Sequence, residues 1–418
     1  MATLVERILS RRMGGPVKAG DIIITELDSY MSHDNTTPLA IKAWRAIGKP
    51  IKHKERIVIH FDHAYPAPNV AAAINQKQSR EFIKAEGIDN FFQRGICHQV
   101  MIEEGFVAPG RVIIGADSHT NTYGAFACFA AGFGSTEIAV AWVSGRVWLR
   151  VPETIRIELE GRLAPGVYAK DVMLETARQL GMDGATYAAI EYGGPFIEAL
   201  PMADRIVFAN MSTELGAKCG LIASDRTTFE FLETETTAKG PFETFAPDAD
   251  ARYMKRIHVD VSELGPLVAC PPRVDDVVPI GKLEGTPIDE VFIGTCTNGR
   301  YEDLELAASL LKGKQVARYT RTIVTPASQR IHDRLEAAGV LRTFHDAGCV
   351  VTSTGCGACI GRHGGVLAPG ERAFTTMNRN FVGRMGSAEA EIYLGSPASA
   401  AATALAGCIS DPRKILGA

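Results

Sequence analysis

Val291-Phe292-Ile293-Gly294-Thr295-Cys296-Thr297-Asn298-Gly299 joins a short apolar run to a polar loop. The apolar run is typical of a strand that is buried on both faces of a parallel sheet. The polar residues begin directly after it, at the strand end where open α/β sheets bind their ligands. Cys296 adds a thiol, which is a strong ligand for soft metals and for iron–sulfur clusters. The stretch therefore predicts an α/β fold with chemistry at the carboxyl end of a strand.

A second cysteine loop, Thr354-Gly355-Cys356-Gly357-Ala358-Cys359-Ile360-Gly361-Arg362, follows later in the chain. Its glycines predict a loop in which the backbone approaches closely and both sulfurs face one point. If the fold brings the two loops together, three thiols converge. Closed zinc sites and ordinary ferredoxin clusters take four protein ligands, whereas a cuboidal cluster held by three cysteines keeps one iron open. An open iron can act as a Lewis acid.

Other interpretations of the cysteines stay open at this point. A redox dithiol usually opens a helix after an early strand, whereas Cys356 and Cys359 lie late and between glycines. A zinc-stabilised, non-catalytic binding protein is an alternative if His363 or His345 supplies a fourth ligand. The remaining cysteines lie mostly in apolar surroundings and are expected to be buried and unreactive: Cys97, Cys128, Cys219, Cys270, Cys349 and Cys408.

The length and amino-acid composition limit the classes of protein to which this chain can belong. The chain has 418 residues, more than one hydrophobic core usually supports, so we expect two or three domains. A hydrophobic content of 46%, with 22% charged residues, is typical of a soluble globular enzyme. The net charge of -4 favours neither nucleic acid nor a membrane as a partner. An odd number of cysteines without a disulfide rhythm favours the cytoplasm, and we find no signal peptide or membrane span.

Short apolar runs alternate with segments of helical period along the chain. We expect strands at 21–26, 56–61, 111–115, 154–160, 289–293 and 372–376. We expect helices at 36–47, 69–87 and 135–146. This alternation predicts mostly parallel sheets with helices on both faces. Changes in composition near residue 150 and within 270–287 predict three α/β domains, at 1–150, 151–275 and 276–418.

Pairs of acid and histidine follow two of the expected strands. Asp62-His63 comes directly after 56–61, and Asp117-Ser118-His119 comes after 111–115. A structural histidine bonded to a carboxylate is the commoner explanation of one such pair. Two pairs and Cys296, all at strand ends, indicate a shared site. There, a carboxylate can hold an imidazolium ready to protonate a leaving hydroxyl.

Two arginines follow the expected strand at 372–376, in Asn378-Arg379-Asn380-Phe381-Val382-Gly383-Arg384. The planar guanidinium group of arginine binds carboxylates through two hydrogen bonds. Arginines also lie on solvated faces or pair with acids such as Glu389. Glycine and asparagine between the arginines favour a shaped loop, which predicts an anionic substrate.

Together, the loops 294–298, 355–361, 115–120 and 378–384 resemble those of the aconitase superfamily. The resemblance covers nearly the whole chain and is closest to the two-subunit branch, the large subunits of 3-isopropylmalate dehydratase and prokaryotic homoaconitase. It implies three α/β/α domains with mostly parallel sheets, and a cluster and active site at strand C-terminal ends between domains. It also implies a hydro-lyase that isomerises a 2-hydroxy acid by dehydration and rehydration. Isopropylmalate, in leucine biosynthesis, is the favoured substrate; homocitrate and related malates are alternatives.

The resemblance assigns roles to individual residues. It implies a [4Fe-4S] cluster, with one iron not bound by protein, on Cys296, Cys356 and Cys359. The residues implied beside the cluster are Asn298, Ile360 and Asn378. The residues implied to be catalytic are Asp62, His63, His98, Asp117, His119 and Glu214. The residues implied to bind substrate are His33, Ser118, Asn210, Arg379 and Arg384.

The sequence departs from aconitase itself in two places. His33 stands where aconitase has a glutamine, which fits the two-subunit branch better and makes citrate a poorer substrate. The chain also ends at Ala418, whereas aconitases continue into a swivelling fourth domain. We therefore expect a separate small subunit that carries this domain, in a heterodimer or heterotetramer. The isolated chain should show little activity, and the acidic charge balance disfavours RNA binding.

Overall fold

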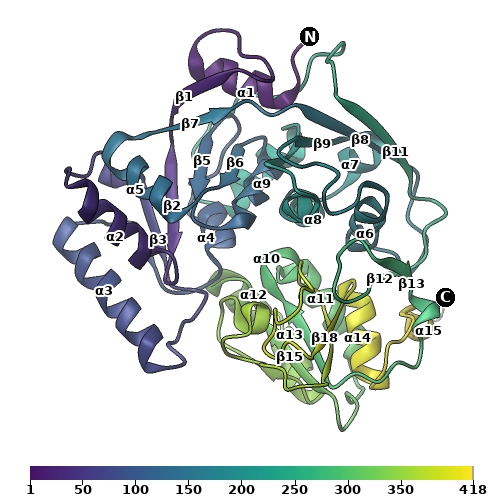
Figure 1. Cartoon of the computed structure of the whole chain (residues 1–418). Helices are drawn as coiled ribbons and strands as arrows, with labels where there is room; N and C mark the ends of the chain where they lie inside the picture. The colour runs from purple at the N-terminus through teal and green to yellow at the C-terminus, as the bar shows by residue number, and fades with distance from the viewer. Residues whose placement is uncertain (417–418) are drawn as a thin grey trace. The chain divides into compact units, whose positions relative to one another are not determined.

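The computed structural model describes residues 1–416 and contains two compact units (Figure 1). Unit 1 comprises Met1–Gln93, Cys97–Glu160 and Ala185–Val259, and unit 2 comprises Arg94–Ile96, Gly161–Gly184 and the chain from Asp260 onward. Each unit contains helices and a largely parallel sheet, so the predicted α/β class is confirmed. The division into three domains stays a prediction.

The first sheet of unit 1 is wholly parallel, in the order β4-β3-β2-β5-β6. Its strands are β2 (Ser29–His33), β3 (Ile57–His60), β4 (Phe91–Phe92), β5 (Val112–Gly115) and β6 (Phe129–Gly132). The central strand, β2, was not predicted, although all its residues are buried. Because β2, β3 and β5 run in the same direction, His33, Asp62 and Asp117 come at the same edge of the sheet.

Helices cover this sheet, and α2 (Thr37–Ile47) packs against α3 (Val70–Glu86) and α5 (Ser135–Ser144) (Figure 1). The other helices that precede residue 130 are α1 (Leu4–Met13), η1 (Lys54–Arg56), α4 (Cys97–Glu103) and η2 (Ser118–Phe126). Helix α5 ends earlier than predicted, because Gly145 takes the left-handed conformation (φ 72°). The chain then forms β7 (Arg146–Arg150), which pairs antiparallel with β1 (Ile22–Glu26).

A second sheet in unit 1 has the order β10-β9-β8-β11. Its strands are β8 (Thr154–Glu160), β9 (Ala189–Gly193), β10 (Cys219–Ile222) and β11 (Lys255–Asp260), and the helices beside it are α7 (Pro195–Ala199), α8 (Met202–Met211), η3 (Ser212–Leu215) and α9 (Arg226–Glu235). A Cβ atom on Gly124 would lie only 1.7 Å from the carbonyl oxygen of Gly220. Glycine at this position therefore lets η2, which carries His119, pack closely against β10.

The sheet of unit 2 has the order β13-β12-β18-β17-β14-β15-β16, in which β14 to β18 are parallel. Its strands are β12 (Leu267–Ala269), β13 (Val277–Pro279), β14 (Glu290–Gly294), β15 (Arg321–Thr325), β16 (Val350–Val351), β17 (Arg372–Thr375) and β18 (Glu391–Leu394). Its helices are α6 (Ala169–Leu180), η4 (Ile280–Lys282), α10 (Thr295–Asn298), α11 (Tyr301–Leu311), α12 (Gln329–Ala337), α13 (Val340–Asp346), η5 (Gly357–Ile360), α14 (Pro397–Ala406) and α15 (Arg413–Leu416). Strand β14 is the apolar run that precedes Cys296, as predicted.

All nine cysteines lie among the described residues, and none of them forms a disulfide. Burial raises the pKa of Cys128, Cys219 and Cys349 to about 12, so these thiols stay protonated and unreactive. Cys270 and Cys408 are less buried than predicted. From Met1 to Leu416, no helix combines the length and the apolar character that crossing a membrane requires.

Candidate active site

Asp117, which follows β5, lies at the centre of a buried polar network in unit 1. One carboxylate oxygen is 2.9 Å from Nε2 of His98, and the other is 3.3 Å from Nε2 of His63 and 3.6 Å from Nε2 of His33. The backbone N–H of His119 donates to the same carboxylate at 2.7 Å. Burial alone would raise the pKa of Asp117, but His98 and the other donors outweigh it and hold this pKa well below its usual range. The carboxylate is therefore an ionised anchor for several imidazoles.

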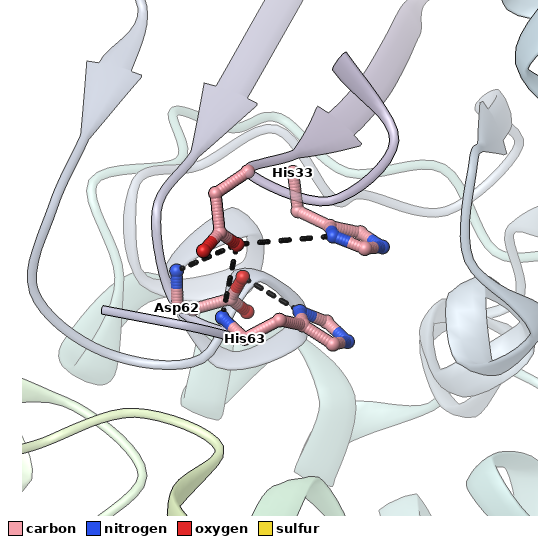
Figure 2. A group of neighbouring side chains, drawn as sticks. His33, Asp62 and His63 are labelled. Carbon is pink, nitrogen blue, oxygen red and sulfur yellow. Dashed lines mark hydrogen bonds and ion pairs between the residues drawn. The ribbon is translucent and has the colours of Figure 1, made fainter. Parts of the chain in front are cut away.

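Asp62 fixes the orientation of His63 (Figure 2). Its carboxylate accepts a hydrogen bond from Nδ1 of His63 at 2.8 Å and one from the backbone N–H of Cys97 at 2.7 Å. Burial opposes ionisation of Asp62, but the neighbouring His63 outweighs it and keeps the pKa of Asp62 well below its ordinary value. Asp34 holds the same turn by accepting the backbone N–H groups of His63 at 3.0 Å and Ala64 at 2.8 Å. These contacts leave Nε2 of His63 directed at Asp117.

The rings of His33 and His63 are stacked, with centroids 3.7 Å apart and an interplanar angle of 13° (Figure 2). Burial, and then the adjacent His63 ring, lower the pKa of His33 to about 4. His33 is therefore neutral at pH 7, so the stack does not place two positive charges face to face. The carboxylate of Asp62 is hydrogen-bonded to His63 and not to His33.

His119 forms the second acid–histidine pair of the network, with a partner far along the chain. Its Nε2 lies 2.7 Å from Oε1 of Glu214, and both side chains are buried. Asn210, which is fully buried, donates to the hydroxyl of Thr122 at 2.8 Å, and that hydroxyl donates to the backbone carbonyl of His119 at 2.6 Å. In this structure Asn210 therefore holds the turn that carries His119. Its contact with substrate stays a prediction.

Four of these side chains could be interpreted as a metal site. Ligand atoms of His33, Asp34, Asp62 and His63 lie within 4.8 Å of one another. However, the carboxylate oxygens of Asp34 and Asp62 already accept backbone N–H groups. These bonds leave fewer lone pairs for a cation. The set is therefore better suited to moving protons than to holding an ion.

In unit 2, both cysteine loops lie at the carboxyl edge of the sheet. Cys296 follows β14, and Thr376, which follows β17, exchanges hydrogen bonds with the backbone of Gly294 at 3.0 and 3.1 Å. A Cβ atom on Gly357 would lie 2.9 Å from Oγ1 of Thr325 and 3.2 Å from the Phe292 ring. The Cys356–Cys359 loop therefore sits against the ends of β14 and β15.

Side-chain donors point at two of the three sulfurs. Nδ2 of Asn378 lies 3.5 Å from Sγ of Cys296, and Nη2 of Arg384 lies 3.3 Å from Sγ of Cys359. Hydrogen bonds of this kind orient and support sulfur ligands of a metal centre. Cys296, Cys356 and Cys359 are 8%, 7% and 7% exposed, so these residues are largely buried but keep a small solvent-accessible surface.

A single zinc ion at the cysteines would need several ligands close together. A tetrahedral zinc ion holds its sulfur ligands about 2.3 Å from the metal, hence roughly 4 Å from one another. In the part of the chain that the structure describes, no three potential ligands within 4.8 Å of one another include a cysteine, and neither His345 nor His363 joins the cysteines in such a group. Residues 1–416 therefore offer no close tetrahedral ligand set for one zinc ion at the cysteines, while thiolates are the donors that an iron–sulfur cluster takes.

A protein-family model matches nearly the whole of this chain. The model of the Aconitase family (aconitate hydratase) matches residues 6–287 and 281–407. The chain belongs to the aconitase family. Hydro-lyase chemistry is therefore the chemistry of its family, and the predicted resemblance is confirmed.

Named relatives of the aconitase family match this chain from end to end. The "3-isopropylmalate dehydratase large subunit 1" of Methanopyrus kandleri is 48% identical over 99% of each chain. The "Homoaconitase large subunit" of Thermus thermophilus is 45% identical over 99% of this chain and 98% of the relative. The crystal structure of Thermococcus kodakaraensis aconitase X covers 90% of this chain and 89% of its own, with a TM-score of 0.50 and 12% identity, which shows a likeness of fold.

In this member of the aconitase family, the predicted site residues form two sets. Unit 1 contains His33, Asp62, His63, His98, Asp117, Ser118, His119, Asn210 and Glu214. Unit 2 contains Cys296, Asn298, Cys356, Cys359, Ile360, Asn378, Arg379 and Arg384. Each set lies at the carboxyl ends of parallel strands in its own unit, or is hydrogen-bonded to residues there. The individual roles stay predictions.

Sequence reasoning missed two basic residues in these sets. His60, the last residue of β3, is buried and stacked on Phe92, with no hydrogen-bond partner for either ring nitrogen among residues 1–416. Lys170 is 1% exposed, and its ammonium donates to the backbone carbonyls of Thr376 at 2.9 Å and Met377 at 2.7 Å and to Asn298 at 3.4 Å. Each is a single basic residue in an apolar segment, which gives no pattern to recognise in the sequence.

Proposed function

We propose that the chain is the large subunit of a 3-isopropylmalate dehydratase, which converts 2-isopropylmalate to 3-isopropylmalate by removing and re-adding water. The proposal includes a [4Fe-4S] cluster on Cys296, Cys356 and Cys359 and a separate small subunit as partner. One structural observation carries it: side-chain donors of Asn378 and Arg384 point at the sulfurs of Cys296 and Cys359. Full-length relatives named as dehydratase large subunits support the substrate and the partner.

The chain's own residues supply the proton chemistry in this proposal. A bound cluster with an open iron supplies a Lewis acid for a hydroxyl group. His63, oriented by Asp62 and facing Asp117, delivers a proton to the leaving hydroxyl, which departs as water, and takes a proton back from the water that returns. Arg379 and Arg384 bind substrate carboxylates and stabilise the negative charge that develops beside the abstracted proton.

His119 and Glu214 act as a second proton relay in the proposal. Their bond joins the turn after β5 to η3, so both groups keep fixed positions during the reaction. A buried imidazole and carboxylate that share one hydrogen bond can transfer a proton without large movement. Two relays suit a reaction that protonates one oxygen and deprotonates one carbon.

Homoaconitase is the second candidate, because relatives of 45% identity carry that name. The test is anaerobic reconstitution of the chain with iron, sulfide and the small-subunit protein of the same organism. We expect kcat/KM for 2-isopropylmalate to exceed that for homocitrate and citrate by at least roughly tenfold. A preference for homocitrate would assign homoaconitase instead. A reconstituted, iron-loaded complex without turnover of any of these acids would overturn the proposal.

A further inference from the structure

A cavity of about 320 Å³ in unit 1 borders the turn that carries Asp117 and Ser118. Gly132 and Gly134, at the end of β6 and the start of α5, line a second side. Thr213, next to Glu214, and Lys218, directly before β10, line the remainder. The family resemblance assigned no role to Lys218.

Lys218 brings a sheltered positive charge to this cavity. Its ammonium donates to the carbonyl oxygen of Gly132 at 3.1 Å and lies 3.7 Å from the centroid of the Phe133 ring. Among residues 1–416, no carboxylate oxygen lies within 4.0 Å of this ammonium, so it forms no ion pair there. Burial lowers the pKa of Lys218, only partly offset by charges such as Glu137. An ammonium has three donors, so donors remain for a ligand.

The rest of the lining also favours an anion. Gly134 caps α5 without a side-chain hydrogen bond, and the carboxylate of Glu137 lies beside it in the first turn of this helix. Ser118 and Thr213 add hydroxyl groups. The carboxylate of Asp117 already lies 2.9 Å from Nε2 of His98 and 3.3 Å from Nε2 of His63. An anion in the cavity would therefore face a cation and hydroxyl donors, beside a carboxylate whose oxygens are turned to the imidazoles.

We propose that this cavity binds a carboxylate group of the hydroxy-acid substrate, with Lys218 as its counter-ion and Ser118 as a hydrogen-bond donor. The inference rests on the proposed function and names a binding group beyond the arginines. Phe133 offers an apolar surface to the carbon chain of the acid. Because an ionic contact of this kind is made equally in the ground state and the transition state, it should govern KM more than kcat.

The first test is steady-state kinetics of the reconstituted complex with 2-isopropylmalate. Lys218→Met keeps the length of the side chain and removes its charge, and should raise KM at least roughly tenfold while kcat changes less than about threefold. Lys218→Arg should recover most of the affinity. The matched control is Lys255→Met, an exposed lysine of the same unit, which should leave both constants unchanged. An unchanged KM in Lys218→Met would overturn the inference.

The second test does not depend on turnover. Calorimetric titration of the full chain with malonate, a dicarboxylate without a hydroxyl group to lose, should give binding that weakens roughly tenfold in Lys218→Met. If that variant does not fold, Ser118→Ala tests the same cavity by the loss of one hydroxyl. Malonate affinity that is unchanged by these substitutions would contradict the inference, even in an active enzyme. Malonate binding that depends on Lys218, in a complex that does not turn over isopropylmalate, would overturn the proposed function alone.

Discussion

Nε2 of His119 and Oε1 of Glu214 lie 2.7 Å apart, although 95 residues separate them in sequence. His119 belongs to the turn after β5, and Glu214 belongs to the short helix η3 that follows α8. The pairing depends on the close packing of η2 against α8 and β10, which Gly124 permits. The contact therefore links two sheets of unit 1 through a group that can carry a proton.

Glu214→Gln should lower kcat by roughly two to four orders of magnitude, because it keeps the shape of the side chain but removes its negative charge. The unfolding midpoint should change little, since the glutamine oxygen still accepts a hydrogen bond from His119. Kinetics of the reconstituted complex and thermal melting of the chain give the two measurements. Glu233→Gln, an exposed acid of the same unit, is the control and should retain full activity. Activity of Glu214→Gln above about a tenth of the unmutated level would exclude a role in proton transfer.

Cys296→Ser should abolish retention of the cluster, because two of three thiolates cannot hold a cuboidal cluster firmly. The measurement is iron and sulfide content after anaerobic reconstitution and desalting, together with the visible absorbance of the cluster. Cys408→Ser, in the same unit and only partly buried, should retain both. Full iron content in Cys296→Ser would exclude Cys296 as a cluster ligand. A redox dithiol at Cys356 and Cys359 would need no iron, so unchanged activity of Cys296→Ser without bound iron would favour the dithiol interpretation.

His60 should make the chain less stable as the pH falls. Burial lowers its pKa to about 3, below the ordinary value of 6.5. Between these two pH values, His60 is protonated in the unfolded chain and neutral in the folded chain. Its contribution to the free energy of unfolding is therefore complete above pH 6.5 and is lost progressively down to about pH 3. At ~1.4 kcal/mol per pKa unit, the loss is roughly 3–5 kcal/mol.

His60→Phe should remove this part of the pH dependence, because phenylalanine fills the same place beside Phe92 without titrating. Urea unfolding at pH 7 and pH 4.5 gives the measurement. The difference between the two pH values should be smaller in the variant than in the unmutated chain. His345→Gln, at an exposed position in unit 2, should leave that difference unchanged. Equal pH dependence in His60→Phe and the unmutated chain would mean that the buried ring titrates normally.

Much of the fold was predictable because most strands are short apolar runs. Residues 57–59 and 291–293 are wholly apolar, and they lie in β3 and β14. Strand β2 was missed because Ser29, Ser32 and His33 make it look polar. Those residues are nevertheless buried, and the hydroxyl of Ser32 is satisfied by Thr37 at 2.8 Å. Tertiary hydrogen bonds of this kind leave no periodicity in the sequence.

The sequence predicted many residues of the candidate site, but it did not predict which of them are hydrogen-bonded to one another. Strand-end position identified Asp62, His63 and Asp117 as a group from local sequence. The choice of Glu214 as the partner of His119 is set by packing between distant segments. Lys218 also could not be found, because a lone lysine before a strand acquires its significance only from the cavity beside it.

Gly357→Ala should loosen the loop that holds Cys356 and Cys359. Gly357 has a φ of 54°, which L-residues disfavour, and a Cβ atom would lie 2.9 Å from Oγ1 of Thr325. Gly313→Ala is the matched control, since Gly313 has a φ of 72° but a Cβ atom there would meet no other atom within 4 Å. Both variants carry similar backbone strain, of order 1 kcal/mol, so the contacts with Thr325 and the Phe292 ring separate them. We expect Gly357→Ala to lose iron several times faster than Gly313→Ala when a chelator is added to the reconstituted chain. Equal rates of iron loss would mean that the close approach of this loop to β15 does not support the cluster.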